Sequence, residues 1–194
     1  TLQAEGKKVL ISIGGEKDPV MLDSLAEKDI FVSSVNQIID DWGLDGLDID
    51  LEKASLHFTD IHVQNIGDVR IQYMIDGIRE IMNNHYLKHG KKLLLTMAPE
   101  TAYVQGGLSE WTINNAYGGA YLPIIEALRD SIDMLNVQLY NSGSQYGLDG
   151  LIYSQGNANW ILAMTEAVIQ GFTCKENLGT YNGFPANKVG VALP

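Results

Sequence analysis

The sequence predicts an α/β fold built around a parallel sheet. Short apolar runs alternate along the 194 residues with longer segments of helical periodicity, and this alternation is typical of βα units. The runs are almost continuously apolar, as strands covered on both faces require. Longer loops follow the runs rather than precede them. No low-complexity linker interrupts the pattern, so we expect residues 1–194 to form a single domain.

Five segments are predicted to be strands. They are residues 7–15 (KKVLISIGG), 44–52 (LDGLDIDLE), 91–100 (KKLLLTMAPE), 133–141 (DMLNVQLYN) and 187–194 (NKVGVALP). In parallel α/β folds, functional residues gather at the C-terminal ends of the strands. Asp50, Glu52, Glu100 and Tyr140 fall at such ends, which favours a site there.

Four helices are predicted between the strands, because apolar residues recur at three- and four-residue spacing. Pro123 suits the first turn of the third helix. Asn157 or Asn159 is a candidate N-cap for the fourth, which would run to Gly171. We expect four inward-facing stripes: Val35, Ile38, Ile39 and Trp42; Ile71, Ile75, Ile78 and Met82; Leu122, Ile125 and Leu128; and Ile161, Met164 and Val168.

Charge and composition exclude several classes of function. The net charge of −11 argues against nucleic acid or an anionic membrane as a partner, because both require basic surface. No apolar run approaches the roughly 20 residues that span a bilayer. The single Cys174 excludes an internal disulfide framework, and we interpret it as a small buried thiol. The N-terminal TLQAEGKKVL has the features of neither a signal peptide nor a transit peptide.

The second predicted strand carries an unusual set of acids. Strand side chains alternate between faces, so Asp48, Asp50 and Glu52 share one side, about 6.6 Å apart for each two residues. Asp45 faces the other way and is better suited to the turn. Crowded carboxylates in a low-dielectric setting cannot all ionise cheaply. One of them is therefore expected to hold a proton near neutral pH, as a general acid must.

Two other interpretations of this strand are weaker. A structural salt-bridge strand would need inward cations, and the nearby Lys53 lies on the opposite face. A calcium loop of the D-x-D-x-D-G type would need a glycine at the turn position, which is absent here. The pattern favours a catalytic carboxylate array.

The motif DGLDIDLE (Asp45 to Glu52) resembles the D-G-x-D-x-D-x-E signature of glycoside hydrolase family 18, the chitinase family. ISIGG (Ile11 to Gly15) resembles the family's S-x-G-G on the third barrel strand. LTMAPE (Leu95 to Glu100) and VQLYN (Val137 to Asn141) resemble its fifth- and sixth-strand segments. The four motifs occur in the family's order, and the chain looks most like the compact bacterial chitinases.

The resemblance implies a substrate-assisted mechanism. Glu52 would protonate the glycosidic oxygen and later activate water. The substrate's 2-acetamido oxygen would be the nucleophile, closing to an oxazolinium-like intermediate. Asp50 would orient the acetamido N–H and stabilise its positive charge, and Asp48 would share a proton or hydrogen bond with Asp50. Tyr140 would hydrogen-bond the acetamido oxygen.

The resemblance also implies residues that line the sugar subsites, namely Gln138, Asn141, Met97 and Glu100. Gln138 stands where many relatives carry methionine. Taken alone, Tyr140 could be an ordinary buried tyrosine and Glu100 a loop cap. Aromatic rings complement apolar sugar faces, and we favour Trp111 and Tyr103 in a loop after a strand over Tyr146, Tyr153 and Trp160. Trp160 is expected to pack within its helix.

Metal and cofactor signals are weak. His85 and His89 are spaced i, i+4 on a predicted helix, yet no carboxylate lies at a metal-site spacing, so we interpret them as a solvated helix face. His57 and His62 lie in a loop without ligand spacing. No glycine-rich phosphate loop or basic patch is present. We expect no metal and no cofactor.

The family fold is a (β/α)8 TIM barrel, and by motif order the five predicted strands are the third to the seventh. The chain opens almost directly on the SIGG strand and stops at VGVALP. Its first, second and eighth strands, and the tryptophan that the last strand usually carries, are not found. We therefore expect a partial family 18 catalytic domain from a larger enzyme.

The expected function is that of a chitinase acting on β-1,4-linked N-acetylglucosamine polymers with retention. An endo-β-N-acetylglucosaminidase acting on N-glycan cores would share the motif. A chitin-binding or lectin-like relative is a third possibility, although such relatives usually lose the acid that is present here as Glu52. We expect a monomer with chitin or chito-oligosaccharides as partners. Secretion is expected by analogy, because chitin is extracellular and insoluble.

Overall fold

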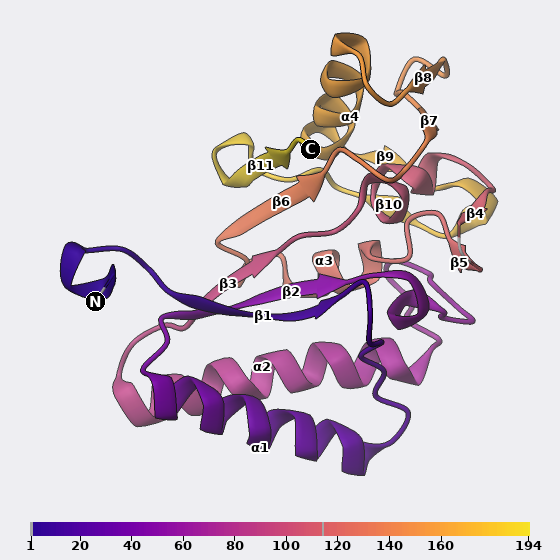
Figure 1. Cartoon of the computed structure of the whole chain (residues 1–194). Helices are drawn as coiled ribbons and strands as arrows, with labels where there is room; N and C mark the ends of the chain where they lie inside the picture. Colours follow the sequence, from indigo (N-terminus) through magenta and orange to yellow (C-terminus); the bar gives the residue numbers. More distant parts are fainter. Residues whose placement is uncertain (1, 114) are drawn as a thin grey trace.

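A five-stranded parallel sheet forms the centre of the computed structural model, which describes residues 2–113 and 115–194 (Figure 1). Its strands are β1 (Leu10–Gly15), β2 (Gly46–Leu51), β3 (Leu94–Met97), β6 (Met134–Gln138) and β11 (Val189–Ala192). They lie side by side in chain order, and every neighbouring pair is parallel. All five predicted strands are therefore confirmed. The order is that of consecutive strands of a (β/α)8 barrel, and the sheet is open across the described residues.

Among the described residues, four α-helices connect the strands: α1 (Leu25–Trp42), α2 (Val69–His89), α3 (Leu122–Leu128) and α4 (Ala158–Gln170). Figure 1 shows α1 and α2 side by side along one face of β1 and β2, with α4 at the end of the sheet formed by β6 and β11. Pro123 lies in the first turn of α3, as predicted. None of the helices in the described part of the chain is long and apolar enough to cross a membrane.

The helix ends follow from local capping chemistry. Ser24 accepts a hydrogen bond from the Glu27 N–H at 3.2 Å, and the Glu27 carboxylate accepts one from the Ser24 N–H at 3.0 Å. This capping box begins α1 ahead of the predicted stripe. Asn157 accepts from the Trp160 N–H at 2.9 Å and caps α4, so the first of the two predicted caps is the one used.

Trp42 does not join the apolar stripe of α1, which corrects the prediction. The indole is 77% exposed, whereas Val35 and Ile39 are 3% and 2% exposed. The buried stripe also includes Phe31 and Val32. Trp42 is the last residue of the helix, immediately before the left-handed cap at Gly43. The other predicted stripes pack inward.

Alternation along β2 separates the core from the acidic face. Leu47, Ile49 and Leu51 have no exposed surface, whereas Asp48 and Asp50 are half-buried. The apolar side of the strand therefore packs towards the core, and the acids lie on the opposite side.

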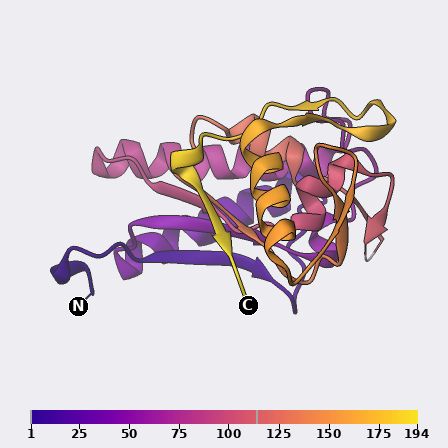
Figure 2. The same cartoon turned by 90° about the horizontal axis from the view of Figure 1, so that it is seen from above.

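Short elements follow the strand ends and fill the predicted loops. Three hairpins occur in the described part of the chain, and Figure 2 shows the third as an extended yellow arm along one side of the molecule. They are β4 (Thr112–Ile113) with β5 (Ala116–Tyr117), β7 (Ser144–Tyr146) with β8 (Ile152–Ser154), and β9 (Phe172–Thr173) with β10 (Thr180–Tyr181). The 3-10 turns are η1 (Leu2–Glu5), η2 (Lys53–Leu56), η3 (Thr101–Tyr103), η4 (Gln105–Leu108), η5 (Lys175–Asn177) and η6 (Ala186–Lys188).

Candidate active site

Asp48 is held between the two strands that flank β2. Its register partners are Ser12 on β1 and Thr96 on β3. The Ser12 hydroxyl donates to Oδ2 at 2.7 Å, and the Thr96 hydroxyl donates to Oδ1. Both oxygens of Asp48 therefore have a strand-borne donor, which fixes the orientation of this carboxylate.

Asp50 receives its hydrogen bond from a more distant strand. Gln138 Nε2 on β6 donates to Asp50 Oδ1 at 2.9 Å and to the Ala98 carbonyl at 2.7 Å. Burial raises the pKa of Asp50 to about 6, with help from the charges of Glu52 and Asp48, while the Gln138 amide opposes the rise. This carboxyl is consequently poised to change charge close to neutral pH.

The link between the two aspartates differs from the expected one. Asp48 bonds to Ser12 and Thr96 rather than to Asp50. Their coupling is electrostatic, because the Asp48 charge contributes to the raised pKa of Asp50. Sequence reasoning missed the roles of Ser12 and Thr96, although both residues lie within the quoted motifs.

Glu52 directly follows β2, and its backbone stays extended with φ −127° and ψ 158°. It is half-buried on the same face as the two aspartates. Tyr140 follows β6 and is also half-buried. Burial raises the pKa of the Tyr140 hydroxyl, and the nearby charges of Asp50, Glu52 and Glu100 raise it further. The structure thus brings four predicted site residues together, namely Asp48, Asp50, Glu52 and Tyr140.

Two features hold the acidic strand in place. Gly14 pairs with Asp50 in the sheet at φ +116°, and a Cβ there would collide with the Asp50 carbonyl. Glycine is therefore required at this position of the SIGG motif. The fully buried Tyr121 donates its hydroxyl to the Ile49 carbonyl at 2.7 Å and accepts the Leu51 N–H at 3.3 Å. No sequence signal identified Tyr121.

Met97 and Tyr103 are not where a sugar could reach them, which corrects both predictions. Each has 0% exposed surface. Met97 pairs in register with Ile49, and residues paired in this way point to the same side of a sheet. Its side chain therefore faces the core, away from Asp48. Tyr103 lies in η3 and is packed in the core cluster.

The remaining subsite candidates differ in exposure. Glu100 and Gln138 are 4% and 6% exposed, whereas Asn141 is exposed, with a left-handed φ of 57°. Trp111 is 41% exposed.

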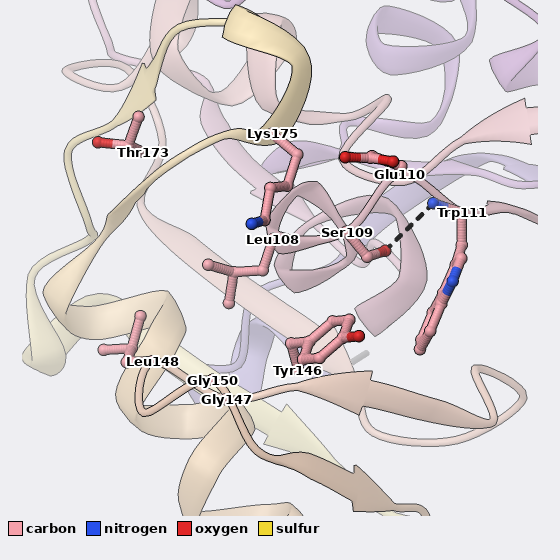
Figure 3. A pocket seen from close by; sticks show the side chains of 10 residues that line it. All are labelled: Leu108, Ser109, Glu110, Trp111, Tyr146, Gly147, Leu148, Gly150, Thr173 and Lys175. Carbon is pink, nitrogen blue, oxygen red and sulfur yellow. Dashed lines mark hydrogen bonds between the residues drawn. The ribbon is translucent and has the colours of Figure 1, made fainter.

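Trp111 belongs to a separate aromatic cavity of about 470 Å³ (Figure 3). Its ring stacks on Tyr146, with centroids 5.1 Å apart. The backbone N–H of Trp111 donates to the Ser109 hydroxyl at 3.4 Å. The wall is completed by Glu110 and Lys175 among others, and none of Asp48, Asp50, Glu52 and Glu100 lines it. The cavity is thus formed by the hairpins and loops beyond the strand ends.

The residues to which the sequence analysis gave no role in the site are either buried or in contact with another side chain. Trp160 has no exposed surface, as expected of a helix-packing residue. Cys174 is 5% exposed, and burial raises its thiol pKa to about 11. His89 contacts the Asp40 carboxylate at 2.8 Å, while His85 is half-buried rather than solvated. Within residues 2–113 and 115–194, no cluster of His, Cys, Asp and Glu could hold a metal ion.

Comparison with known proteins finds relatives along almost the whole chain. The model of the family described as glycosyl hydrolases family 18 matches residues 2–193. Exochitinase 1 of Streptomyces olivaceoviridis is 43% identical over 202 residues, which cover 99% of this chain and 33% of that protein. A probable class II chitinase of Arthroderma benhamiae is 39% identical over 197 residues, covering 99% of this chain and 58% of that protein.

A solved structure shows the same fold. The family 18 chitinase from Chromobacterium violaceum superposes with a TM-score of 0.81 at 32% identity, covering 99% of this chain and 48% of that one. The chain therefore spans between a third and about three fifths of the length of these relatives. With the family model matching nearly every residue, the chain belongs to glycosyl hydrolase family 18.

Proposed function

We propose that the protein is a chitinase that hydrolyses β-1,4-linked N-acetylglucosamine polymers with retention of anomeric configuration. The observation that carries the proposal is the acidic face at the end of β2. There Asp48, Asp50 and Glu52 lie on one side of the strand, with Gln138 bonded to the central aspartate. A wall of carboxyl groups in which the central Asp50 has its pKa raised to about 6 suits acid–base chemistry on a glycosidic bond.

Glu52 is assigned the role of general acid and then general base. It extends from the strand end beyond the two aspartates, at the position nearest the loops. A carboxyl there can protonate the glycosidic oxygen in the first step. The resulting carboxylate can take a proton from the attacking water in the second.

Asp50 and Tyr140 are assigned to the substrate's 2-acetamido group. Ionised Asp50 can accept the acetamido N–H and stabilise the positive charge that develops as the acetamido oxygen attacks the anomeric carbon. The Tyr140 hydroxyl can donate to that oxygen and hold it in place. Asp48 is fixed by Ser12 and Thr96, and its charge is one cause of the raised pKa of Asp50.

The rest of the binding site is assigned to the loops beyond the strand ends. Asn141 is exposed next to Tyr140 and can donate to a sugar hydroxyl. Trp111 and Tyr146 present a stacked aromatic surface that suits the apolar face of a pyranose ring. Since the polymer is insoluble and extracellular, we place the activity outside the cell.

The test is turnover of a fluorogenic chitotriose by the protein at its natural length, with Glu52→Gln as the variant. We expect the variant to lose about 10²- to 10⁴-fold in kcat, because it removes the proton donor, while oligosaccharide binding survives. Glu166→Gln is the matched control, since Glu166 is exposed on α4.

Comparing cellulose with chitin tests whether the substrate's acetamido group takes part in the reaction. Cellulose lacks the acetamido group, so it should not be cleaved, and efficient cellulose hydrolysis would rule out substrate assistance. Wild-type-like turnover by Glu52→Gln would refute the acid assignment. Binding of chito-oligosaccharides by both proteins without turnover by either would identify a non-catalytic binding protein. Release of N-glycans in place of chitin fragments would identify an endo-β-N-acetylglucosaminidase.

A further inference from the structure

Ser142 is a buried serine in the segment between Tyr140 and the β7–β8 hairpin, and the assigned reaction gives it no role. Only 3% of the residue is exposed, although Asn141 and Gly143 on either side of it are exposed. Serine is mostly found on protein surfaces. A serine buried between two exposed neighbours is expected to have its polar groups bonded within the protein, and its partners show what the burial achieves.

The hydroxyl of Ser142 joins two loops at the C-terminal ends of the strands. Its oxygen accepts a hydrogen bond from the Ala102 N–H at 3.1 Å, and the hydroxyl donates to the Tyr140 carbonyl at 3.2 Å. Ala102 belongs to η3, the turn that follows β3, and is 1% exposed. One side chain therefore ties the backbone of Tyr140 to a buried turn that follows a different strand.

The main chain of Ser142 is bonded to the hairpin that follows it. Its N–H donates to Gln155 Oε1 at 3.0 Å, and its carbonyl accepts from Gln145 Nε2 at 3.0 Å. The Gln155 N–H in turn donates to the Gly143 carbonyl at 3.2 Å. Together with the two bonds of the hydroxyl, these contacts fix Ser142 between η3 and the hairpin, so the turn cannot shift without breaking several hydrogen bonds.

The backbone is also held on the other side of Tyr140. The Thr101 hydroxyl, again from η3, donates to the Gln138 carbonyl at 2.8 Å. Asn141 adopts a left-handed φ of 57°, which asparagine tolerates better than most residues do. The chain turns at Asn141, and this turn allows the Ser142 hydroxyl to reach back to the Tyr140 carbonyl. Two hydroxyl contacts from or to η3 thus bracket the residue that carries the phenol.

We propose that Ser142 is a positioning residue that holds Tyr140 in place for the substrate's acetamido oxygen by tying its backbone to η3. This inference rests on the proposed function, because that function assigns Tyr140 to the acetamido group. Ser142 is enclosed and acts through Tyr140 rather than on the sugar. A reacting group has to be held to within a fraction of an ångström, so a loosened backbone lowers the rate without removing any group that touches substrate.

Turnover of fluorogenic chitotriose by the protein at its natural length tests this role. We expect Ser142→Ala to lower kcat by about ten- to a hundredfold through misplacement of Tyr140, with KM changed less than about twofold. Ser144→Ala is the matched control, because it removes an exposed hydroxyl from β7 that lies 3.1 Å from that of Ser154. Gln155→Met removes the acceptor of the Ser142 N–H from an exposed position. It takes the place of Ser142→Ala in every measurement if that variant does not fold.

A double-mutant cycle separates positioning from a general loss of structure. Tyr140→Phe removes the hydroxyl that Ser142 is proposed to hold in place. If Ser142 acts through that hydroxyl, adding Ser142→Ala to Tyr140→Phe should cost less than about twofold in residual kcat. Equal losses in the two backgrounds would show that Ser142 supports the fold alone, and the proposal would be refuted.

Fluorine NMR of protein labelled with 3-fluorotyrosine provides a readout that does not depend on turnover. The Tyr140 signal is identified by its absence from Tyr140→Phe. Ser142→Ala should move this signal by more than its linewidth, while the signals of the exposed Tyr86 and Tyr117 stay in place. An unmoved Tyr140 signal, or an unchanged kcat in an active enzyme, would overturn the proposal. If the wild type cleaves no chito-oligosaccharide while the Tyr140 signal moves, the proposed function fails and the positioning of Tyr140 by Ser142 stands.

Discussion

The hydrogen bond from Gln138 to Asp50 makes a quantitative prediction about the acidic side of the pH profile. Gln138→Met replaces the amide with an apolar group of nearly the same length. It therefore removes the donor 2.9 Å from Asp50 Oδ1 with little change in volume. Asp50 then loses the interaction that opposes the rise in its pKa.

The size of the effect follows from the charge on the acceptor. A hydrogen bond to an ionised group is worth about 1.5 kcal/mol at the lower end of its range, and one pKa unit corresponds to about 1.4 kcal/mol. The pKa of Asp50 should therefore rise from about 6 to about 7 in the variant. Because Asp50 has to be ionised to stabilise the acetamido charge, kcat/KM should fall about tenfold at pH 5 and remain near the wild-type value at pH 8.

The assay is the pH profile of kcat/KM on fluorogenic chitotriose, measured for wild type, Gln138→Met and Gln170→Met. Gln170 is exposed on α4, and its side-chain amide donates to Glu166, so its substitution controls for the chemical change itself. A thermal unfolding scan at each pH separates lost activity from lost fold. If Gln138→Met raises KM equally at every pH with an unmoved acidic limb, Gln138 acts by touching the sugar, and the reasoning is wrong.

Three further predictions follow from named contacts. Tyr121→Phe leaves the Leu51 N–H without its partner in the core, so the free energy of unfolding should fall by about 1–3 kcal/mol, measured by urea denaturation. Asp68→Asn weakens the buried pair with Arg70 and should be less stable than wild type at pH 7. Burial raises the pKa of Asp68, but hydrogen bonds from Arg70 and Thr59 outweigh it and hold the pKa below its ordinary value. The stability difference should therefore close as pH falls through the lowered pKa and the wild-type carboxylate is protonated. Trp111→Ala should raise KM for long chito-oligosaccharides about tenfold through lost stacking, with kcat on the short substrate retained.

Each of these variants has a matched control. Tyr117→Phe removes a hydroxyl at a site that is 39% exposed, Asp41→Asn removes a surface carboxylate, and Trp42→Ala removes an indole that is 77% exposed. An unchanged urea midpoint for Tyr121→Phe would contradict the role given to its hydroxyl. A stability difference for Asp68→Asn that persists in strong acid would contradict the ion pair. Equal loss on short and long substrates for Trp111→Ala would contradict an extended binding surface.

Much of the site could be predicted because alternation in a strand is a local property. The positions of Asp48, Asp50 and Glu52 on one face follow from a period of two residues, and the structure has both aspartates on the side opposite Leu47 and Ile49. The same rule, applied to the LTMAPE segment, would have excluded Met97 from the predicted sugar-binding residues. It lies an odd number of residues from Glu100 along an extended segment, and hence on the other face.

Other assignments depended on contacts that no local pattern encodes. Tyr121 reaches the acidic strand across 72 residues of sequence, and Gln138 reaches Asp50 across 88. Trp42 and Tyr103 are both aromatic residues near the end of an element, yet one is 77% exposed and the other fully buried. Only the packing of distant elements decides between these outcomes.

The sequence by itself determined the strands, the helices, the acidic face and the family, because these depend on periodicity, capping and short motifs. Tertiary structure alone decided which donors hold Asp48 and Asp50, that Met97 and Tyr103 are enclosed, and that Glu100 is buried. The physical reason is that hydrogen bonding, burial and proton affinity depend on distances in space, and the sheet register brings together residues that are far apart in the chain.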